Sequence, residues 1–170
     1  IVGNPKKLSE KYYKEGIDEI FFIDSVASLY DRKYVFKIIE DVCKNIFVPI
    51  CMGGGLKNLK DVEKAFKSGA DKVFINTGAF KNPDLISKLI KIYGSQCIVG
   101  SVEAKKIGKE FIAFINNGRE PTNLKAEEWA IRLEKAGVGE IFLTSVDRDG
   151  TKKGLDLELI KKIRNKIRVP

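Results

Sequence analysis

The groups in this chain that could move protons are carboxylates and lysines, because its 170 residues include no histidine. Glu103 closes the segment 97–103, which is apolar up to Ser101, and strand alternation places these two side chains on the same side. A carboxylate where a strand ends is a candidate general acid or base, and an ordinary surface salt bridge explains it equally well. Asp24, near the end of the segment 19–25, has the same two interpretations.

Two polar segments are candidates for binding a phosphate group. Gly54 and Gly55 follow the predicted strand 48–52, where bare backbone N–H groups let an anion approach, although a glycine-rich turn is more often only a turn. Asn76 and Thr77 come at the end of the next predicted strand and offer an amide and a hydroxyl. Because these groups belong to neighbouring strand ends, they favour a phosphate site over a simple turn.

A second phosphate site is predicted in the segment 144–151, which is more polar than a plain connection requires. The candidate residues there are Thr144, Ser145, Asp149 and Gly150. The alternative is an Asp-Gly turn of the kind that is common in loops. Two such sites would suit a small molecule that carries two phosphates.

Three charged residues, Glu19, Lys72 and Glu140, open three of the predicted strands, at the edge opposite to the candidate sites above. Opposite charges at these positions could close a ring. Solvated strand ends also explain the pattern, and spacing alone does not favour the ring.

The elements that position these residues alternate between short apolar segments and longer amphipathic ones, a pattern typical of a parallel sheet with crossover helices. The predicted strands are 19–25, 48–52, 72–76, 97–103 and 140–146. The predicted helices are about 5–15, 32–45, 58–68, 83–93, 124–136 and 156–166. A polar hairpin at 105–110 leads into 111–115, which we expect to be an extra strand outside the alternation.

An internal repeat indicates duplicated half-barrels. Residues 14–21 and 135–142 agree at five of eight positions at an offset of 121, and the pairs Val48-Pro49 and Val169-Pro170 keep that offset. The repeat makes the polar segment after 140–146 the counterpart of the Asp24 loop. We therefore expect an α/β fold, a (β/α)8 barrel, with residues 1–170 forming one partial barrel domain of about five strands. The first strand and the last two strands are expected to lie outside this sequence.

Composition restricts the class of protein. An apolar content of 44% supports one sizeable core, and the net charge of +8 is scattered along helical segments, so we expect no nucleic acid partner. No stretch approaches the roughly 18 apolar residues of a membrane span, so we expect no membrane contact and a cytoplasmic location. The three cysteines are odd in number and widely spaced, which favours reduced core thiols over a disulfide framework or a zinc site. We predict no metal and no cofactor.

Four segments resemble the cyclase subunit of imidazole glycerol phosphate synthase, and the resemblance covers the entire chain. They are 52–55, 69–77, 94–96 and 143–151. The related isomerase of the preceding histidine-pathway step shares the last segment but is less similar around Asn76-Thr77 and 94–96. The resemblance implies a lyase that takes ammonia from a glutaminase subunit and condenses it with a bisphosphorylated ribulosyl-formimino substrate. The products would be imidazole glycerol phosphate and the aminoimidazole carboxamide ribotide.

The resemblance also implies roles for individual residues. The positions that match the residues binding one phosphate in the family are Gly55, Asn76 and Thr77. Asp149 and Gly150 match positions that help to bind the other phosphate. Glu19, Lys72 and Glu140 match the charged gate through which ammonia enters.

Two departures from the family pattern leave the acceptor of the ammonia open. The family has two catalytic aspartates, the first on the opening strand and the second at the position of Glu103. A glutamate there moves the carboxyl group by about one methylene, and a displacement of roughly 1 Å can cost about a hundredfold in rate. The segment 24–30 also differs from the usual Thr-Ala-Ser after the aspartate. Both features resemble paralogues that occur with amidation of surface-polysaccharide sugars and also pair with a glutaminase-like partner. A third possibility is a non-catalytic scaffold that docks a glutaminase through Glu19, Lys72 and Glu140.

Overall fold

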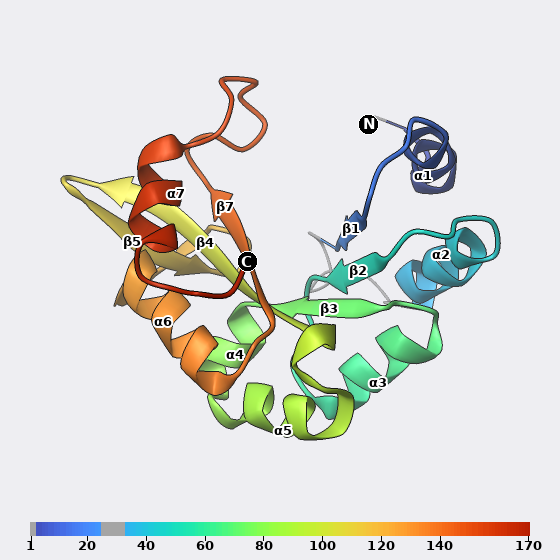
Figure 1. Cartoon of the computed structure of the whole chain (residues 1–170), viewed down its shortest axis with the longest axis horizontal. Helices are drawn as coiled ribbons and strands as arrows, with labels where there is room; N and C mark the ends of the chain where they lie inside the picture. The colour runs from blue at the N-terminus through green and yellow to red at the C-terminus, as the bar shows by residue number, and fades with distance from the viewer. Residues whose placement is uncertain (1–2, 25–32) are drawn as a thin grey trace. The chain divides into compact units, whose positions relative to one another are not determined.

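The computed structural model describes residues 3–24 and 33–170 (Figure 1). The chain divides into two compact units, one up to Val73 and one from Phe74 to Pro170, and each is described by itself. The segment 25–30, which carries most of the second departure from the family pattern, lies outside the described residues.

The first unit alternates helices with short parallel strands. Its elements are α1 (Pro5–Lys14), β1 (Ile20–Ile23), α2 (Lys33–Cys43), β2 (Ile50–Gly53) and α3 (Leu59–Lys67). β1 pairs in parallel with β2, with Ile20 opposite Ile50. α1 begins after Asn4, whose side chain accepts hydrogen bonds from two N–H groups of the first turn. All four residues of β2 are buried, as expected for a strand inside a parallel sheet.

The second unit is built around β4, a strand of ten residues. β3 (Lys72–Ile75) crosses the boundary between the units, and β4 (Ile98–Ile107) pairs in parallel with β7 and antiparallel with β5, which pairs with β6 (Figure 1). The other strands are β5 (Glu110–Ile115), β6 (Glu120–Lys125) and β7 (Glu140–Ser145). The helices are α4 (Thr77–Lys81), α5 (Asp84–Tyr93), the 3-10 helix η1 (Ser95–Cys97), α6 (Ala126–Ala136) and α7 (Leu157–Arg164).

α6 covers one face of β4, and this packing defines which side chains of β4 remain for a site. A Cβ on Gly100 would lie 2.9 Å from the side chain of Leu133 in α6, so the two elements are in close contact. Val102, two residues further along β4, is completely buried. Because side chains alternate along a strand, Ser101 and Glu103 point to the face of β4 opposite α6.

Main-chain hydrogen bonds confirm the internal repeat. In the first unit, the N–H of Ile20 donates to the Pro49 carbonyl oxygen at 3.0 Å. In the second unit, the N–H of Ile141 donates to the Pro170 carbonyl oxygen at 2.8 Å. Ile141 and Pro170 each follow their counterparts, Ile20 and Pro49, by the repeat offset of 121 residues. The two bonds occupy equivalent places, each beside the first strand after the repeated helix. The repeat predicted from sequence therefore has a counterpart in the main-chain pairing at these two places.

The five predicted strands are confirmed as β1, β2, β3, β4 and β7, and the predicted extra strand is β5. A (β/α)8 barrel has eight parallel strands, so the described residues supply five of them. The assignment of residues 1–170 to one barrel domain stays a prediction. No helix in the described ranges is long and apolar enough to cross a membrane. The three cysteines are free, and Cys51 is buried.

Some boundaries differ from the sequence prediction, and three elements, β6, α4 and η1, were not predicted. β4 continues to Ile107 instead of ending at Glu103, because its second half forms a hairpin with β5. β6 and α4 are additional elements, and the helix expected from residue 124 begins at Ala126. β6 has no apolar alternation in its first residues, and it is a strand because it pairs with β5.

Gly54 allows a close approach between two main-chain segments of the first unit. Its φ angle is +95°, and a Cβ at this position would overlap the carbonyl oxygen of Asp24. The N–H of Asp24 donates to the Gly53 carbonyl oxygen at 2.9 Å, which continues the pairing of β1 with β2 by one residue. Only glycine fits here, since a side chain would meet main chain that has no rotamer to adopt.

We expect Gly54→Ala to destabilise the protein more than Gly16→Ala. Gly16 also has a positive φ, +84°, but nothing lies within 4 Å of its Cβ position, so it measures backbone strain alone. That strain is expected to cost about 1–2 kcal/mol, and the steric overlap at Gly54 about 1–3 kcal/mol more. Urea denaturation of the two variants tests this, and equal losses of unfolding free energy would contradict it.

Candidate functional site

Glu103 lies in the middle of β4, on the face opposite α6. In the register with β7 it is opposite Thr144, and in the register with β5 it is opposite Phe114. Ser101, on the same face of β4, is buried with 1% of its surface exposed. Ser101 and Glu103 lie on one side of the strand, as predicted, and the register with β7 adds Thr144 to that surface, although β4 does not end there.

The Glu103 carboxylate is half-buried and held by two donors. The main-chain N–H of Gly118 donates to its Oε2 at 2.5 Å, and the side chain of Asn76 also forms a hydrogen bond to it. Burial raises the pKa of Glu103 above its ordinary value of 4.5, and the two hydrogen bonds oppose that rise. A carboxyl group with a raised pKa in a defined position is a candidate acid–base group.

Asn76 uses its amide group inside the protein. Its Nδ2 donates to the Phe114 carbonyl oxygen at 2.9 Å as well as to Glu103, so both N–H bonds are engaged. Its Oδ1 is buried and has no hydrogen-bond partner among the described residues. Beside it, the Thr77 hydroxyl oxygen accepts the N–H of Asn116 at 2.9 Å, which leaves the hydroxyl hydrogen to donate. The predicted pair thus joins Glu103 in one cluster.

The turn after β5 completes this cluster, and sequence reasoning did not identify it. Asn116, Asn117 and Gly118 have φ angles of 53°, 58° and 69°, three left-handed residues in a row. Asparagine and glycine are the residues that tolerate this conformation best. The sequence Asn-Asn-Gly after an apolar strand was a signal for a tight turn, but it gave no indication that the Gly118 N–H would reach Glu103.

In the first unit, the predicted charged residues Glu19 and Lys72 form an ion pair. The Nζ of Lys72 lies 3.0 Å from one carboxylate oxygen of Glu19 and 3.1 Å from the other. The two side chains are 24% and 22% exposed, so solvent screens this pair less than an ordinary surface pair. Glu140 opens β7 in the second unit, as predicted.

The candidate residues after β7 lie in an exposed turn. The N–H groups of Arg148 and Asp149 both donate to the Ser145 carbonyl oxygen, at 3.0 and 2.9 Å. Gly150 follows with a φ of +70° and no atom near its Cβ position. The turn that the Asp-Gly sequence predicts is therefore present, and its polar groups face solvent.

A pocket of about 360 Å³ lies in the second unit away from these residues. It is lined mainly by apolar side chains of α4, α5, β6 and α6, including Phe80 and Trp129. Their rings meet edge to face with centroids 5.4 Å apart. None of the predicted site residues lines this pocket. Within the described residues, no three His, Cys, Asp or Glu side chains are grouped so as to hold a metal ion.

The raised pKa of Glu103 predicts a pH-dependent contribution to stability. A carboxyl group whose pKa is higher in the folded state favours folding when protonated, and this contribution is lost as pH rises through the folded pKa. The free energy of unfolding of the wild type, relative to Glu103→Gln, should therefore fall as pH rises from about 4 to 7. Urea denaturation of both proteins across this range is the measurement. A difference that rises with pH would contradict the shift.

Comparison with known proteins identifies the family. A family model described as a histidine biosynthesis protein matches residues 1–170. Imidazole glycerol phosphate synthase subunit HisF of Legionella pneumophila is 45% identical over 171 residues, which cover all of this chain and 81% of that protein. The subunits of the same name from Dehalococcoides mccartyi and Dictyoglomus turgidum are 43% and 44% identical, and the chain spans 66% and 64% of their lengths. The chain belongs to the histidine biosynthesis protein family.

Proposed function

We propose that this chain is part of a cyclase subunit of imidazole glycerol phosphate synthase, a cytoplasmic lyase of histidine biosynthesis. In this proposal a glutaminase subunit supplies ammonia, and the substrate is a bisphosphorylated ribulosyl-formimino compound. The names of the relatives support the enzyme and describe it as a subunit. The reaction requires no cofactor, and neither nucleic acid nor a membrane takes part.

Glu103 is the observation that carries this proposal. Its carboxyl group has a raised pKa and a fixed direction, since Gly118 and Asn76 hold it from two sides. A group of this kind transfers protons more effectively near neutral pH than a fully solvated carboxylate does. Glu103 would act as one acid–base group of the cyclisation. The family resemblance implies a second carboxylate on an opening strand that this sequence does not include.

In each unit, the groups proposed to contact phosphate are hydrogen-bond donors that are exposed or not already used within the protein. In the second unit the Thr77 hydroxyl has a hydrogen to donate, whereas the side-chain N–H groups of Asn76 are already engaged. Asn76 would therefore act mainly on Glu103 or through its main chain. Gly54 and Gly55 would supply main-chain N–H groups in the first unit. The other phosphate would bind at the turn after β7, through Thr144 and the main chain of Gly150. Ser145, whose hydroxyl donates to Asp156, and Asp149, whose N–H donates to Ser145, would shape that turn.

The ion pair of Glu19 with Lys72 in the first unit is proposed to belong to the ammonia gate. The ion pair at 3.0 Å supports a closed gate in this state.

A second candidate is a paralogous subunit that supplies ammonia for amidation of a surface-polysaccharide sugar. Glu103 favours it, because this glutamate stands where the histidine-pathway cyclase has an aspartate. The barrel, the gate and the glutaminase partner are common to both proposals, and only the acceptor differs. The substrate that the protein turns over decides between them.

We expect Glu103→Gln to lower kcat by about 10²–10⁴ while KM changes little, because the amide keeps the shape but cannot transfer a proton. The assay uses the protein in its full reading frame, an ammonium salt and the bisphosphorylated formimino substrate, and follows release of imidazole glycerol phosphate. Glu128→Gln, on the exposed surface of α6, is the matched control and should be unchanged. Glu103→Asp should keep or raise activity in a histidine-pathway enzyme. The sugar-amidation proposal would be favoured if the wild-type protein neither turns over this substrate nor rescues a cyclase-deficient histidine auxotroph.

Lys72→Met should uncouple glutamine use from product formation. With the glutaminase partner and glutamine, we expect product per glutamine hydrolysed to fall by roughly tenfold, since one charge of the gate is left without its partner. With ammonium salt and no glutamine, turnover should be nearly normal. Lys67→Met is the control, because Lys67 pairs with Glu63 on the exposed surface of α3. Equal coupling in the two variants would remove the gate from the proposal.

A further inference from the structure

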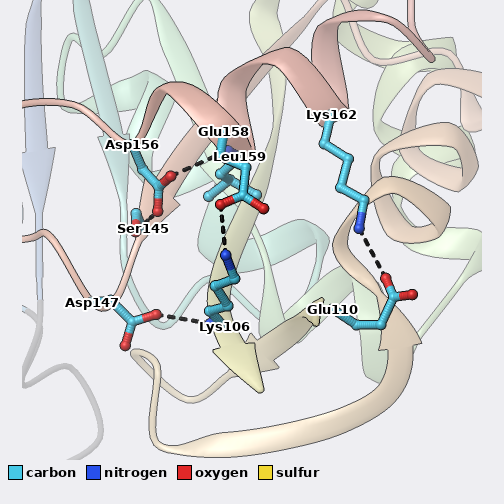
Figure 2. Close-up of polar contacts among 8 residues, drawn as sticks. All are labelled: Lys106, Glu110, Ser145, Asp147, Asp156, Glu158, Leu159 and Lys162. Atoms are coloured by element: carbon cyan, nitrogen blue, oxygen red, sulfur yellow. Dashed lines mark hydrogen bonds and ion pairs between the residues drawn. The ribbon is translucent and has the colours of Figure 1, made fainter. Parts of the chain in front are cut away.

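One carboxylate closes the loop between β7 and α7, residues 146–156, at its base. The hydroxyl of Ser145, the last residue of β7, donates to one oxygen of Asp156 at 2.9 Å (Figure 2). The other oxygen of Asp156 accepts the N–H of Leu159 at 3.2 Å and so caps α7. Asp156 therefore joins the end of a strand to the first turn of the next helix.

A second carboxylate fixes the direction in which the chain leaves β7. Beyond the last paired residues, the N–H of Val146 still donates to the Ala104 carbonyl oxygen at 2.8 Å. The next hydrogen bond between the two segments involves a side chain, since Oδ2 of Asp147 accepts the main-chain N–H of Lys106 at 2.8 Å (Figure 2). Asp147 thus replaces a strand residue as the acceptor while the main chain turns away from β4.

The ion pairs around these bonds are weaker restraints. The ammonium of Lys106 lies 2.6 Å from Glu158 in α7, and that of Lys162 lies 2.9 Å from Glu110 in β5 (Figure 2). In the first pair the side chains are 43% and 60% exposed, and exposed pairs contribute little. Asp147 and Asp156, which accept main-chain or hydroxyl hydrogens in fixed geometry, are therefore the stronger restraints on the loop.

The loop needs such restraints because its turn is strained. Lys152 has a φ of +59°, a conformation that a residue other than glycine rarely adopts. Thr151 stabilises the turn locally, since its hydroxyl donates to the Arg148 carbonyl oxygen at 2.7 Å and accepts the N–H of Lys153 at 3.3 Å. These bonds shape the turn, but they do not connect it to the sheet. The turn is connected to the sheet by the bonds of Arg148 and Asp149 to the Ser145 carbonyl oxygen. At the two ends of the loop, the carboxylates of Asp147 and Asp156 connect it as well.

We propose that Asp147 and Asp156 are positioning residues that hold the turn 148–151 over the end of β7, where the second phosphate binds. This inference rests on the proposed function, which places a phosphate at Thr144 and Gly150. Neither aspartate contacts the phosphate. Both carboxylates accept hydrogen bonds from donors of the protein itself, and the cationic side chains of Arg148, Lys152 and Lys153 lie on the same loop.

The test uses alanine and asparagine variants of both residues in the protein's full reading frame. Asp147→Ala and Asp156→Ala each remove acceptors, and we expect KM for the bisphosphorylated substrate to rise roughly tenfold with kcat within about twofold. Asp147→Asn and Asp156→Asn keep an amide oxygen in place and should restore most of the affinity. They also keep the test valid where an alanine variant fails to fold. Lys106→Met is the control, because it removes an exposed ion pair but leaves the main-chain N–H that Asp147 accepts.

Tryptic cleavage after Arg148, Lys152 and Lys153 reports on the loop without reference to the reaction. We expect the alanine variants to be cleaved there several-fold faster than the wild type, the asparagine variants and Lys106→Met. Unchanged cleavage, or faster cleavage with an unchanged KM, would overturn the proposal.

Inorganic phosphate separates a failure of this inference from a failure of the proposed function. One outcome is that the wild type does not turn over the substrate, but phosphate slows tryptic cleavage of its loop. If phosphate does not slow cleavage of the alanine variants, this result still supports the positioning role. Absence of phosphate protection in the wild type, or equal protection in all variants, would overturn it.

Discussion

The double pairing of β4 is the constraint on which the second unit depends. β4 pairs in parallel with β7 through six residue pairs and, over its second half, antiparallel with β5. A parallel neighbour alone would let the strand end near Glu103, as the alternation of the sequence suggests. The hairpin extends β4 beyond that residue, so Glu103 emerges from the middle of a strand with neighbours on both sides. Its position is therefore set by main-chain pairing and not by a loop.

The same hairpin supplies the chemistry around Glu103. β5 ends in a left-handed turn, and that turn returns the N–H of Gly118 to the carboxylate. The Phe114 carbonyl, also on β5, orients the amide of Asn76 towards Glu103. A glutamate reaches about one methylene further than an aspartate at the same place. A donor on the hairpin provides a fixed partner for that longer side chain, so the departure from the family pattern has a local structural counterpart.

The sequence predicted the repeated parts of the fold better than the additions to them. The strands β1, β2, β3, β4 and β7 follow from apolar segments separated by amphipathic helices, and the repeat predicted equivalent surroundings for Pro49 and Pro170. β6 could not be predicted, because its first residues are polar and only its pairing with β5 makes it a strand. The contact of Gly118 with Glu103 joins residues 15 apart through a turn whose geometry no local pattern specifies. The charges of Glu19 and Lys72 suggested a pair that spacing alone did not favour over solvated strand ends, and in the structure the two side chains meet.

Asp147, Asp156 and Glu103 carry the same functional group in different surroundings, and we propose different roles for them. Asp147 and Asp156 accept hydrogen bonds from main-chain N–H groups, and these bonds fix the chain around them. Glu103 also accepts such a bond, which lowers its pKa, but its burial acts in the opposite direction and is the larger effect, so its pKa is raised. A carboxylate that holds the chain in place keeps its hydrogen-bond partners. A carboxyl group that transfers protons must gain and lose its proton at a moderate free-energy cost. The burial of its carboxyl group, which outweighs its hydrogen bonds, therefore distinguishes Glu103, the residue proposed for chemistry, from Asp147 on the exposed loop.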